Sequence, residues 1–256
     1  MPFSEEYKGF GETRKRSSSE YVKFTPDYRV VLRVLNPTAR TLWKHWIPQA
    51  NGGRGMGAVC ANTAPGLNIC PIEQSVAHLP KDAEERKEVS ARKRFVVNVL
   101  DRTLFTTCKH CNTLTPGKSN PAVAGKTCVN CGGDLKGHDF APLNRVKILE
   151  HGPRLFNQQL NNIERIQKEE LGEKAEDITK YDITFTTIGD GRDKVITALP
   201  QDPKELPEDV FIDPETGEPQ KLFDLELLAE PPSTEELSLM LQGATIEQLN
   251  AVRGIE

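Results

Sequence analysis

The sequence has little of what a membrane or secreted protein needs. No apolar run approaches the roughly 20 residues that cross a bilayer, and residues 1–16 lack the apolar stretch of a signal peptide. Hydrophobic residues make up 37% and aromatic residues 6% of the 256 residues, and the mean hydropathy is −0.51. This apolar share is below that of an ordinary globular domain. We expect neither membrane insertion nor secretion, and we expect part of the chain to form a tail.

The common motifs of enzymes are also missing. The sequence contains no Gly-rich phosphate loop followed by Lys-Ser/Thr, no His-Glu-x-x-His and no nucleophile elbow. Gly189-Asp190-Gly191 stands between two strand-like segments, so we interpret it as a hairpin turn rather than a cofactor loop. We therefore expect a protein without enzymatic activity.

Charge is divided unevenly along the chain. Residues 201–256 hold 14 acidic and 3 basic residues, a net charge of −11, whereas residues 1–200 hold 30 basic and 23 acidic residues, a net charge of +7. A basic body with an acidic tail is typical of a nucleic-acid-binding protein whose tail contacts partners, although a solvated tail without a partner has the same composition. The acidic tail could also lie over the nucleic-acid site and compete with phosphates at low salt.

Short strands dominate the residue pattern. Apolar positions alternate with polar ones over 28–34, where Arg29 and Arg33 are expected to face outward, and strand-like runs recur over 92–100, 145–149, 181–188 and 194–199. The fold class predicted from these residues is mainly β, a small barrel or sandwich with helical decoration.

Helices are expected in three places. Apolar residues recur at helical spacing over 153–171, and Pro71 begins a segment compatible with a helix that continues through the charged run 81–90. Ser233-Thr234-Glu235-Glu236 has the order of a helix cap, which predicts a short helix through Leu241. This helix and the apolar residues after it either dock on a partner or pack back onto the chain itself. Glycine-rich residues 51–69 are expected to form a loop.

Two Cys-x2-Cys pairs give the strongest local signal. Cys108 and Cys111 form the first pair, and Cys128 and Cys131 form the second, 16 residues further on. Two such knuckles supply the four thiolates that tetrahedral zinc takes in a closed structural site. The sequence therefore predicts a zinc ribbon that folds around its metal and leaves no open position for catalysis.

A second group of metal-ligand residue types is less regular. His45, Cys60, Cys70 and Glu73 lie in and around the glycine-rich segment, and a His-Cys-Cys-carboxylate zinc site is chemically allowed. In the alternative interpretation Cys60 and Cys70 are ordinary buried thiols and His45 is a surface or groove residue between Trp43 and Trp46.

The order of these features resembles the single-stranded DNA-binding proteins of T-even bacteriophages and their relatives in other tailed phages. The resemblance covers about residues 14–200, and it rests on the Trp-x-x-Trp region, the His…Cys-x9-Cys-Pro order, Lys-Arg-Phe-Val-Val-Asn-Val-Leu and Tyr-Asp-Ile-Thr-Phe-Thr-Thr-x-Gly-Asp-Gly. It implies an OB-fold that binds single-stranded DNA, with a basic N-terminal arm 1–20, a core of 21–107 plus 140–200, the ribbon 108–139 as an insertion, and the acidic tail 201–256.

The resemblance also implies ligands and partners. His45, Cys60 and Cys70 match the first three zinc ligands of the family, and Glu73 stands where the family has a fourth Cys. Arg14, Lys15 and Arg16 match a basic run linked to cooperativity, that is, self-association along the strand. The implied role is to coat and protect single strands during phage DNA replication, recombination and repair in the cytoplasm of the infected host, with the tail recruiting a polymerase or a helicase/primase loader.

Binding of single strands without sequence readout needs cations for phosphates and flat rings for bases. The candidates for phosphate contacts are Arg29, Arg33, Lys93 and Arg94. The candidates for stacking are Trp43, Trp46, Phe95 and Tyr181, with Phe185 behind them, and core packing is the alternative for each ring. The competing function is a zinc-ribbon accessory factor that docks on an RNA polymerase or a replication enzyme.

Overall fold

The computed structural model describes residues 20–26, 29–47, 56–61, 70–116, 127–128, 130–189, 193–213, 216–244 and 248–249. These residues fall into two compact units. The described part of the first unit comes from Arg40–Val96 and Asp224–Glu256, and that of the second from Ser18–Ala39 and Val97–Phe223. One strand, β4 (Arg92–Asp101), contributes its first half to the first unit and its second half to the second.

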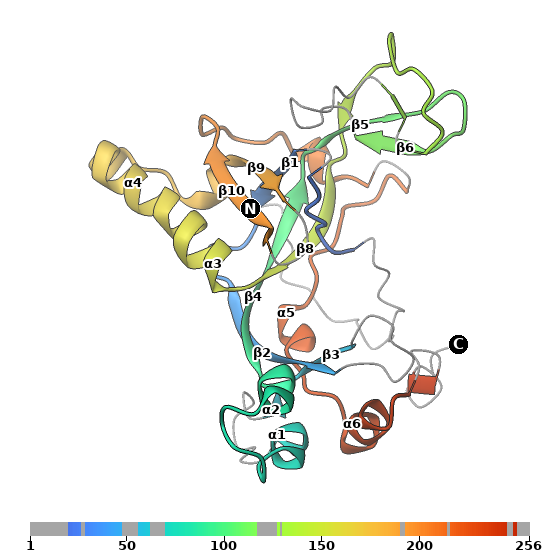
Figure 1. Ribbon diagram of the computed structural model, residues 1–256. Coiled ribbons are helices and arrows are strands. Elements are labelled where there is room, and N and C mark those ends of the chain that lie inside the picture. The colour runs from blue at the N-terminus through green and yellow to red at the C-terminus, as the bar shows by residue number, and fades with distance from the viewer. Residues whose placement is uncertain are drawn as a thin grey trace. The chain divides into compact units, whose positions relative to one another are not determined.

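The second unit is built on antiparallel strands (Figure 1). Strand β9 pairs with both β10 and β1, β1 pairs with β4, and β8 also pairs with β4. The register places Leu32 opposite both Ile183 and Asp101. The strands other than β4 are β1 (Val30–Val34), β8 (Arg145–His151), β9 (Asp182–Ile188) and β10 (Val195–Pro200). The mainly β prediction is therefore confirmed, and the strand-like runs at 145–149, 181–188 and 194–199 are strands.

A helical segment connects β8 to β9. It comprises α3 (Pro153–Leu155), a π-helical turn (Phe156–Leu160) and α4 (Asn161–Leu171). Of the four apolar positions that predicted the helix, Phe156, Leu160 and Ile163 are buried, and Ile166 is partly buried. The π-helical turn was not predicted, because its apolar spacing differs little from that of an α-helix. Its Gln159 accepts a hydrogen bond from the backbone N–H of Ala198 in β10, 3.2 Å away.

The first unit pairs β2 with β4 on one side and with β3 on the other. Its elements besides β4 are β2 (Arg40–Ile47), β3 (Met56–Val59), α1 (Pro71–Ser75), α2 (Glu84–Val89), α5 (Leu225–Leu228) and α6 (Thr234–Leu241). Two expectations are corrected here. Residues 56–59 form a strand although glycine-rich composition predicted a loop, because Met56, Ala58 and Val59 bury against the unit. The expected single helix over 71–90 is two short helices, separated by residues 76–83.

Three short strands near the two Cys-x2-Cys pairs form a small sheet. Strand β5 (Leu104–Thr107) pairs with β6 (Leu114–Pro116) and with β7 (Ala141–Pro142). The buried residues next to it are Cys108, Cys128 and Leu135, with Phe140 packed against them. Such a core is too small to hold a domain together without a further link.

The acidic stretch after β10 differs from the expected free tail. Its residues 201–223 belong to the second unit. Gln220 donates to the carbonyl oxygen of Asn144 at 2.5 Å and accepts from the backbone N–H of Val146 at 2.8 Å. Asn98 exchanges two hydrogen bonds with the backbone of Phe223. The stretch has few helical or strand residues, but side-chain amides fix its backbone to β4 and β8.

No helix among the described residues has both the length and the apolar composition that a membrane span requires.

Candidate metal centres and nucleic-acid interface

The four cysteines of the ribbon converge. The sulfur atoms of Cys108 and Cys131 lie 3.8 Å apart, and those of Cys111 and Cys128 lie 3.6 Å apart. All four sulfur atoms lie within 4.8 Å of one another, and none is in a disulfide. A tetrahedral metal with bonds of about 2.3 Å to sulfur requires sulfur atoms about 3.8 Å apart. The predicted four-cysteine cluster is thus present with spacing that could hold a metal ion.

The two knuckles have the same backbone geometry. In the first, the N–H of Asn112 donates to the carbonyl of Cys108 and the N–H of His110 donates to its sulfur, at 2.8 and 3.4 Å. In the second, the N–H groups of Gly132 and Asn130 make the corresponding bonds to Cys128, at 2.9 and 3.4 Å. Asn112 and Gly132 both have positive φ, 54° and 70°. A left-handed residue after each pair turns the chain so that both thiols face the same point.

The thiols of the cluster differ in their pKa values because their surroundings differ. The hydroxyl of Thr115 is the main cause that lowers the pKa of Cys128 to about 6. The backbone N–H of Gly133 favours ionisation of Cys131, but the neighbouring thiols and burial outweigh it and raise the pKa to about 12. Four thiols this close cannot all ionise without a cation among them. The donor set therefore suits a divalent metal that binds thiolates.

A second group of ligand atoms lies in the first unit. Nε2 of His45 is 3.2 Å from Sγ of Cys70, and these two atoms and Sγ of Cys60 lie within 4.8 Å of one another. All three residues are buried. The interpretation of His45 as a surface residue is therefore wrong. We call these three residues the His-Cys-Cys triad.

The surroundings of the triad orient its histidine. Nδ1 of His45 lies 2.6 Å from the carbonyl oxygen of Val89. A carbonyl accepts only, so Nδ1 is the donor in this contact, and Nε2 faces the sulfur of Cys70. Cys60 follows β3 and its N–H donates to the carbonyl of Trp43 at 2.8 Å, whereas Cys70 is the N-cap of α1. These contacts give the triad the arrangement of metal ligands. Glu73 is exposed on α1 and is not in the group of close ligand atoms.

The β2–β4 pair carries exposed rings and cations on both faces. Trp43 lies opposite Lys93, and Thr41 lies opposite Phe95. Residues that are opposite one another, or two apart on a strand, share a face of the sheet. Thr41, Trp43, Lys93 and Phe95 therefore share one face, which we call the Trp43 face. Trp43 is 42% exposed, and Nζ of Lys93 lies 4.9 Å from the ring centroid of Phe95.

The opposite face is the more basic one. It holds Lys44, Trp46, Arg92 and Arg94, with Lys44 directly opposite Arg92, and we call it the Trp46 face. Trp46 is 48% exposed and lies opposite Gly57. The Lys44 side chain lies where a Cβ on Gly57 would be, so any larger residue there would displace this lysine. The two tryptophans, both candidates for stacking, thus lie on opposite faces of the sheet.

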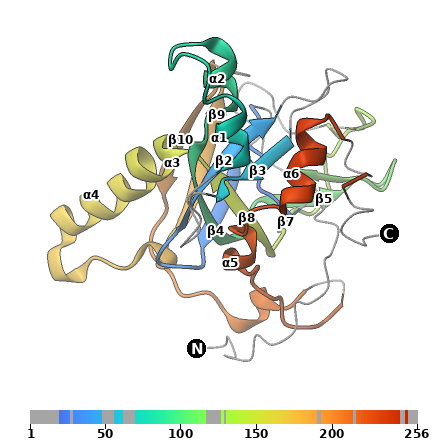
Figure 2. The same ribbon diagram turned by 90° about the horizontal axis from the view of Figure 1, so that it is seen from below.

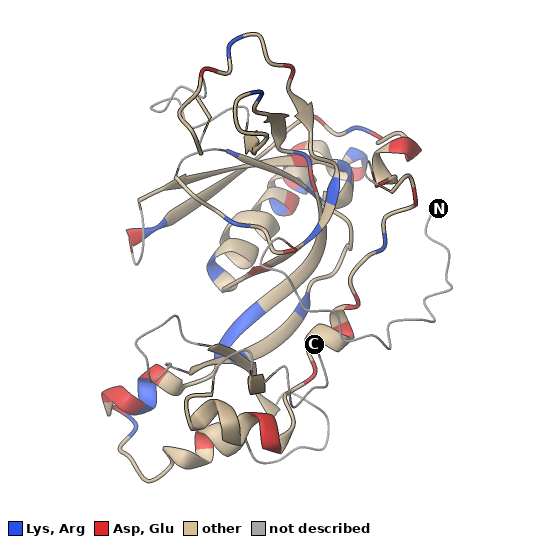
Figure 3. Cartoon of the chain, turned by 90° about the vertical axis from the view of Figure 1, so that its right-hand side faces the viewer, with Lys and Arg blue, Asp and Glu red and all other residues tan. Residues whose placement is uncertain are grey.

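Sequence reasoning missed Lys44 and Arg92 on this surface. Arg92 belongs to the run Arg92-Lys93-Arg94, which forms the basic start of β4 (Figure 3). The run of three basic residues could have identified Arg92 as a candidate contact, because side chains on both accessible faces of a strand can reach solvent.

Other candidate contacts lie elsewhere in the structure. Arg29 is exposed in the second unit, as expected. The expectation that Arg33 faces outward is wrong, because Arg33 is buried and its Nε lies 2.9 Å from the Asp182 carboxylate. Tyr181 and Phe185 are each 1% exposed, so they pack in the core and present no face for stacking. Arg14, Lys15 and Arg16 lie outside the described residues.

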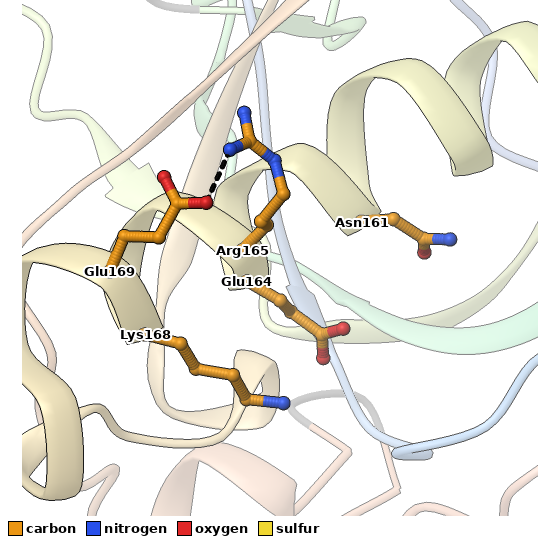
Figure 4. A pocket seen from close by; sticks show the side chains of 5 residues that line it. All are labelled: Asn161, Glu164, Arg165, Lys168 and Glu169. Carbon is orange, nitrogen blue, oxygen red and sulfur yellow. Dashed lines mark hydrogen bonds and ion pairs between the residues drawn. The ribbon is translucent and has the colours of Figure 1, made fainter.

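A pocket on α4 carries no comparable chemistry (Figure 4). Its lining comes from successive turns of this one helix, and Arg165 pairs with Glu169 at 2.5 Å. Two acidic and two basic side chains line it with one amide, so its charges balance. The lining residues are Asn161, Glu164, Arg165, Lys168 and Glu169.

A scan of the chain against models of protein families and a search of curated proteins find no match.

Proposed function

We propose that the protein binds single-stranded DNA without sequence readout, and that bases stack on the Trp43 face of the first unit. The observation that carries the proposal is the placement of Lys93 opposite Trp43 and over the ring of Phe95. Two partly accessible rings and a cation on one face of the strand pair match the combination that binds bases and phosphates of a flexible strand.

Further cations lie on the opposite face of the same strand pair, the Trp46 face. Arg92 and Arg94 flank Lys93 in β4, and Lys44 lies across from Arg92. Two cations directly opposite one another on a strand pair destabilise a sheet by up to about 1 kcal/mol. An anionic ligand offsets that repulsion, and the DNA backbone supplies such anions.

The strand connections of the second unit support an OB-fold. An OB-fold is a five-stranded, partly open Greek-key barrel. In chain order β1, β4, β8, β9 and β10 give five strands, with β1 paired to both β4 and β9 and the helical segment between β8 and β9. Residues 40–91 of the first unit then lie in the connection between the first two strands, and the four-cysteine ribbon lies in the next connection. Loops after the first strand are among those that bind oligonucleotides in OB-folds.

Zinc is the proposed metal of the four-cysteine cluster. Four thiolates in a closed tetrahedron are its usual structural site, and the sulfur spacings given above fit it. The His-Cys-Cys triad is proposed to bind a second zinc through one imidazole nitrogen and two thiolates. Both ions would have a structural role, in which they tie together segments with little apolar core.

Membership of the T-even-type phage family remains the proposed identity. It predicts that the protein coats single strands during phage DNA replication, recombination and repair in the host cytoplasm. Neighbouring copies and phage replication proteins are the proposed protein partners.

The two tryptophans make the proposal directly testable. In W46F the only tryptophan is Trp43, and in W43F the only tryptophan is Trp46. We expect oligo-dT to quench the fluorescence of W46F strongly and that of W43F weakly. The logarithm of affinity should fall with the logarithm of salt concentration, with a slope of about −0.7 per phosphate contacted.

Four outcomes would count against the proposal. Equal quenching in both variants would mean that DNA does not prefer the Trp43 face. Salt-independent binding or a preference for duplex DNA would contradict single-strand binding. Affinity for an RNA polymerase or replication enzyme, without affinity for bare single strands, would favour the accessory-factor function.

A further inference from the structure

The His-Cys-Cys triad shares its hydrophobic core with the C-terminal helix. One cluster of buried residues joins the two thiols to both C-terminal and β-strand side chains. Its members are Ile47, Met56, Ala58, Cys60, Cys70, Ile72, Leu237, Met240, Ala244 and Leu249. Four of these ten residues come from α6 and the positions after it. We call α6 together with Ala244 and Leu249 the C-terminal latch.

The latch has one buried side and one exposed side. Leu237 and Met240 are buried, whereas Leu241 on the same helix is 43% exposed. The start of α6 is fixed by a capping box, in which the hydroxyl of Ser233 accepts from the N–H of Glu236 and the Glu236 carboxylate accepts from the N–H of Ser233. The apolar side of α6 is therefore fixed towards the core of the first unit.

Contact between two helices connects the latch to the ligands. Helix α6 packs against α1 (Figure 2), and Cys70 is the N-cap residue of α1. Cys60 and Cys70 are each 2% exposed and His45 is fully buried. Reagents or metal ions can reach these sulfur atoms only when part of the surrounding core opens. The side chains of the latch belong to the same hydrophobic core as Cys60 and Cys70. Undocking of the latch would therefore open that core.

We propose that the C-terminal latch and metal binding at the His-Cys-Cys triad are coupled: bound metal holds the latch docked, and release of the latch opens the triad to solvent. Coupling of two equilibria is reciprocal, so each event shifts the other by the same factor. Because of this coupling, a partner protein that captures the C-terminal segment would promote metal release from the triad. Conversely, loss of the metal would free that segment for a partner. The proposal rests on the proposed metal site and is independent of DNA binding.

The first arm of the test measures access to the thiols. Zinc-loaded full-length protein is alkylated with N-ethylmaleimide, and each cysteine is followed by peptide mass spectrometry. We expect L237A to raise the alkylation rates of Cys60 and Cys70 by roughly tenfold or more, since loss of a buried leucine favours local opening. The matched control L241A changes an exposed leucine of the same helix and should leave these rates unchanged. Rates at Cys108 and Cys128 should stay unchanged in both variants.

The second arm uses the unsubstituted chain, so it stands if L237A fails to fold. Hydrogen exchange of residues 234–241 is compared before and after zinc removal by a chelator, and we expect faster exchange after removal. C70S, which removes one triad ligand, should show the same increase, whereas C108S, which removes a ribbon ligand, should not.

Three results would overturn the proposal. One is equal alkylation of Cys60 and Cys70 in L237A and L241A. Another is unchanged exchange of 234–241 when zinc has demonstrably left the triad. The last is a zinc content of one per chain that C108S abolishes and C70S does not alter, because the triad would then bind no zinc.

Discussion

The guanidinium group of Arg33 in β1 is held against the carboxylate of Asp182 in β9, with Nε and Oδ1 2.9 Å apart and each side chain 3% exposed. The other carboxylate oxygen lies 2.8 Å from Nζ of Lys204 and 3.6 Å from Nε of Arg102. Arg33 also donates to the carbonyl oxygens of Thr179 and Lys204, at 3.2 and 2.9 Å. The Asp182 carboxylate thus links β1, β9 and the start of the acidic stretch. Arg33 therefore has a structural role, and its buried side chain is not available to DNA phosphates.

Replacing Asp182 should destabilise the second unit. D182N leaves three cations around a neutral amide, and removing one partner of a buried ion pair costs about 3–5 kcal/mol. We expect urea unfolding at pH 7 to show a loss of that order. D202N, which changes an exposed aspartate nearby in the chain, should change the free energy of unfolding little.

The same carboxylate predicts how stability depends on pH. Burial opposes ionisation of Asp182, but the Lys204 hydrogen bond and the charges of Arg33, Lys204 and Arg102 outweigh it and lower its pKa. A lowered folded-state pKa gives stability that is present above the unfolded value of about 3.9 and is lost as pH falls below it. The free energy of unfolding of the wild type should therefore fall as the pH drops below about 4, and D182N should show a smaller fall. An equal fall in both proteins would contradict this role.

The four-cysteine cluster should behave as an independent structural metal site. C131S removes one of the four ligands, and a ribbon of this size depends on its metal for most of its folding energy. We expect metal analysis to show about one zinc fewer per chain, with faster hydrogen exchange over residues 104–116. C60S should lose the other zinc and leave exchange over 104–116 unchanged. Freshly purified protein without zinc would contradict the zinc assignment for both sites.

The sequence predicted features whose signals are local. The spacing of Cys108 and Cys111, repeated at Cys128 and Cys131, sufficed because a knuckle is formed by consecutive residues. Alternation located β9 and β10 for the same reason, since strand periodicity is visible within one segment. The helix cap at Ser233 is likewise a four-residue pattern, and its capping box is present.

Features that depend on distant partners could not be predicted. Alternation placed Arg33 opposite the apolar face of its strand, but its partner Asp182 is 149 residues away, and no local pattern indicates that pairing. Tyr181 was equally ambiguous, because an aromatic residue in a strand suits a core as well as a binding surface. Acidic composition suggested that residues 201–256 form a detached tail, whereas individual side chains such as Gln220 and Leu237 determine where they pack.

Asn98 should be essential for holding the acidic stretch on β4. Its side-chain amide donates to the carbonyl of Phe223 at 3.0 Å and accepts from the N–H of Phe223 at 2.9 Å, and it is buried. N98A leaves both backbone groups without this partner, at a cost of about 1–3 kcal/mol for each group that stays buried and unsatisfied. We expect lower thermal stability and faster protease cleavage within 201–223. Unchanged cleavage would show that other contacts hold the stretch.

Removing the C-terminal segment should weaken DNA binding. A chain that ends at residue 232 lacks Leu237 and Met240, and truncating a buried leucine or methionine to alanine alone costs about 2–5 kcal/mol. That loss is a large share of the roughly 5–15 kcal/mol that stabilises a domain. We expect the first unit, which carries the Trp43 face, to unfold or melt at a much lower temperature. Affinity for oligo-dT should fall at every salt concentration, in contrast to the gain expected from a detachable competing tail.

Charge competition by the acidic residues can be tested without disturbing the core. Glu230 and Glu235 are exposed, and E230Q/E235Q reduces the negative charge by two while leaving Leu237 and Met240 in place. If these charges compete with phosphates, affinity for oligo-dT should rise modestly at about 0.01 M salt, where the screening length is about 30 Å, and the gain should vanish by about 1 M, where it is about 3 Å. Thermal melting should match the wild type, which separates this electrostatic effect from the truncation. Unchanged affinity at low salt would mean that these two acidic residues do not compete with DNA.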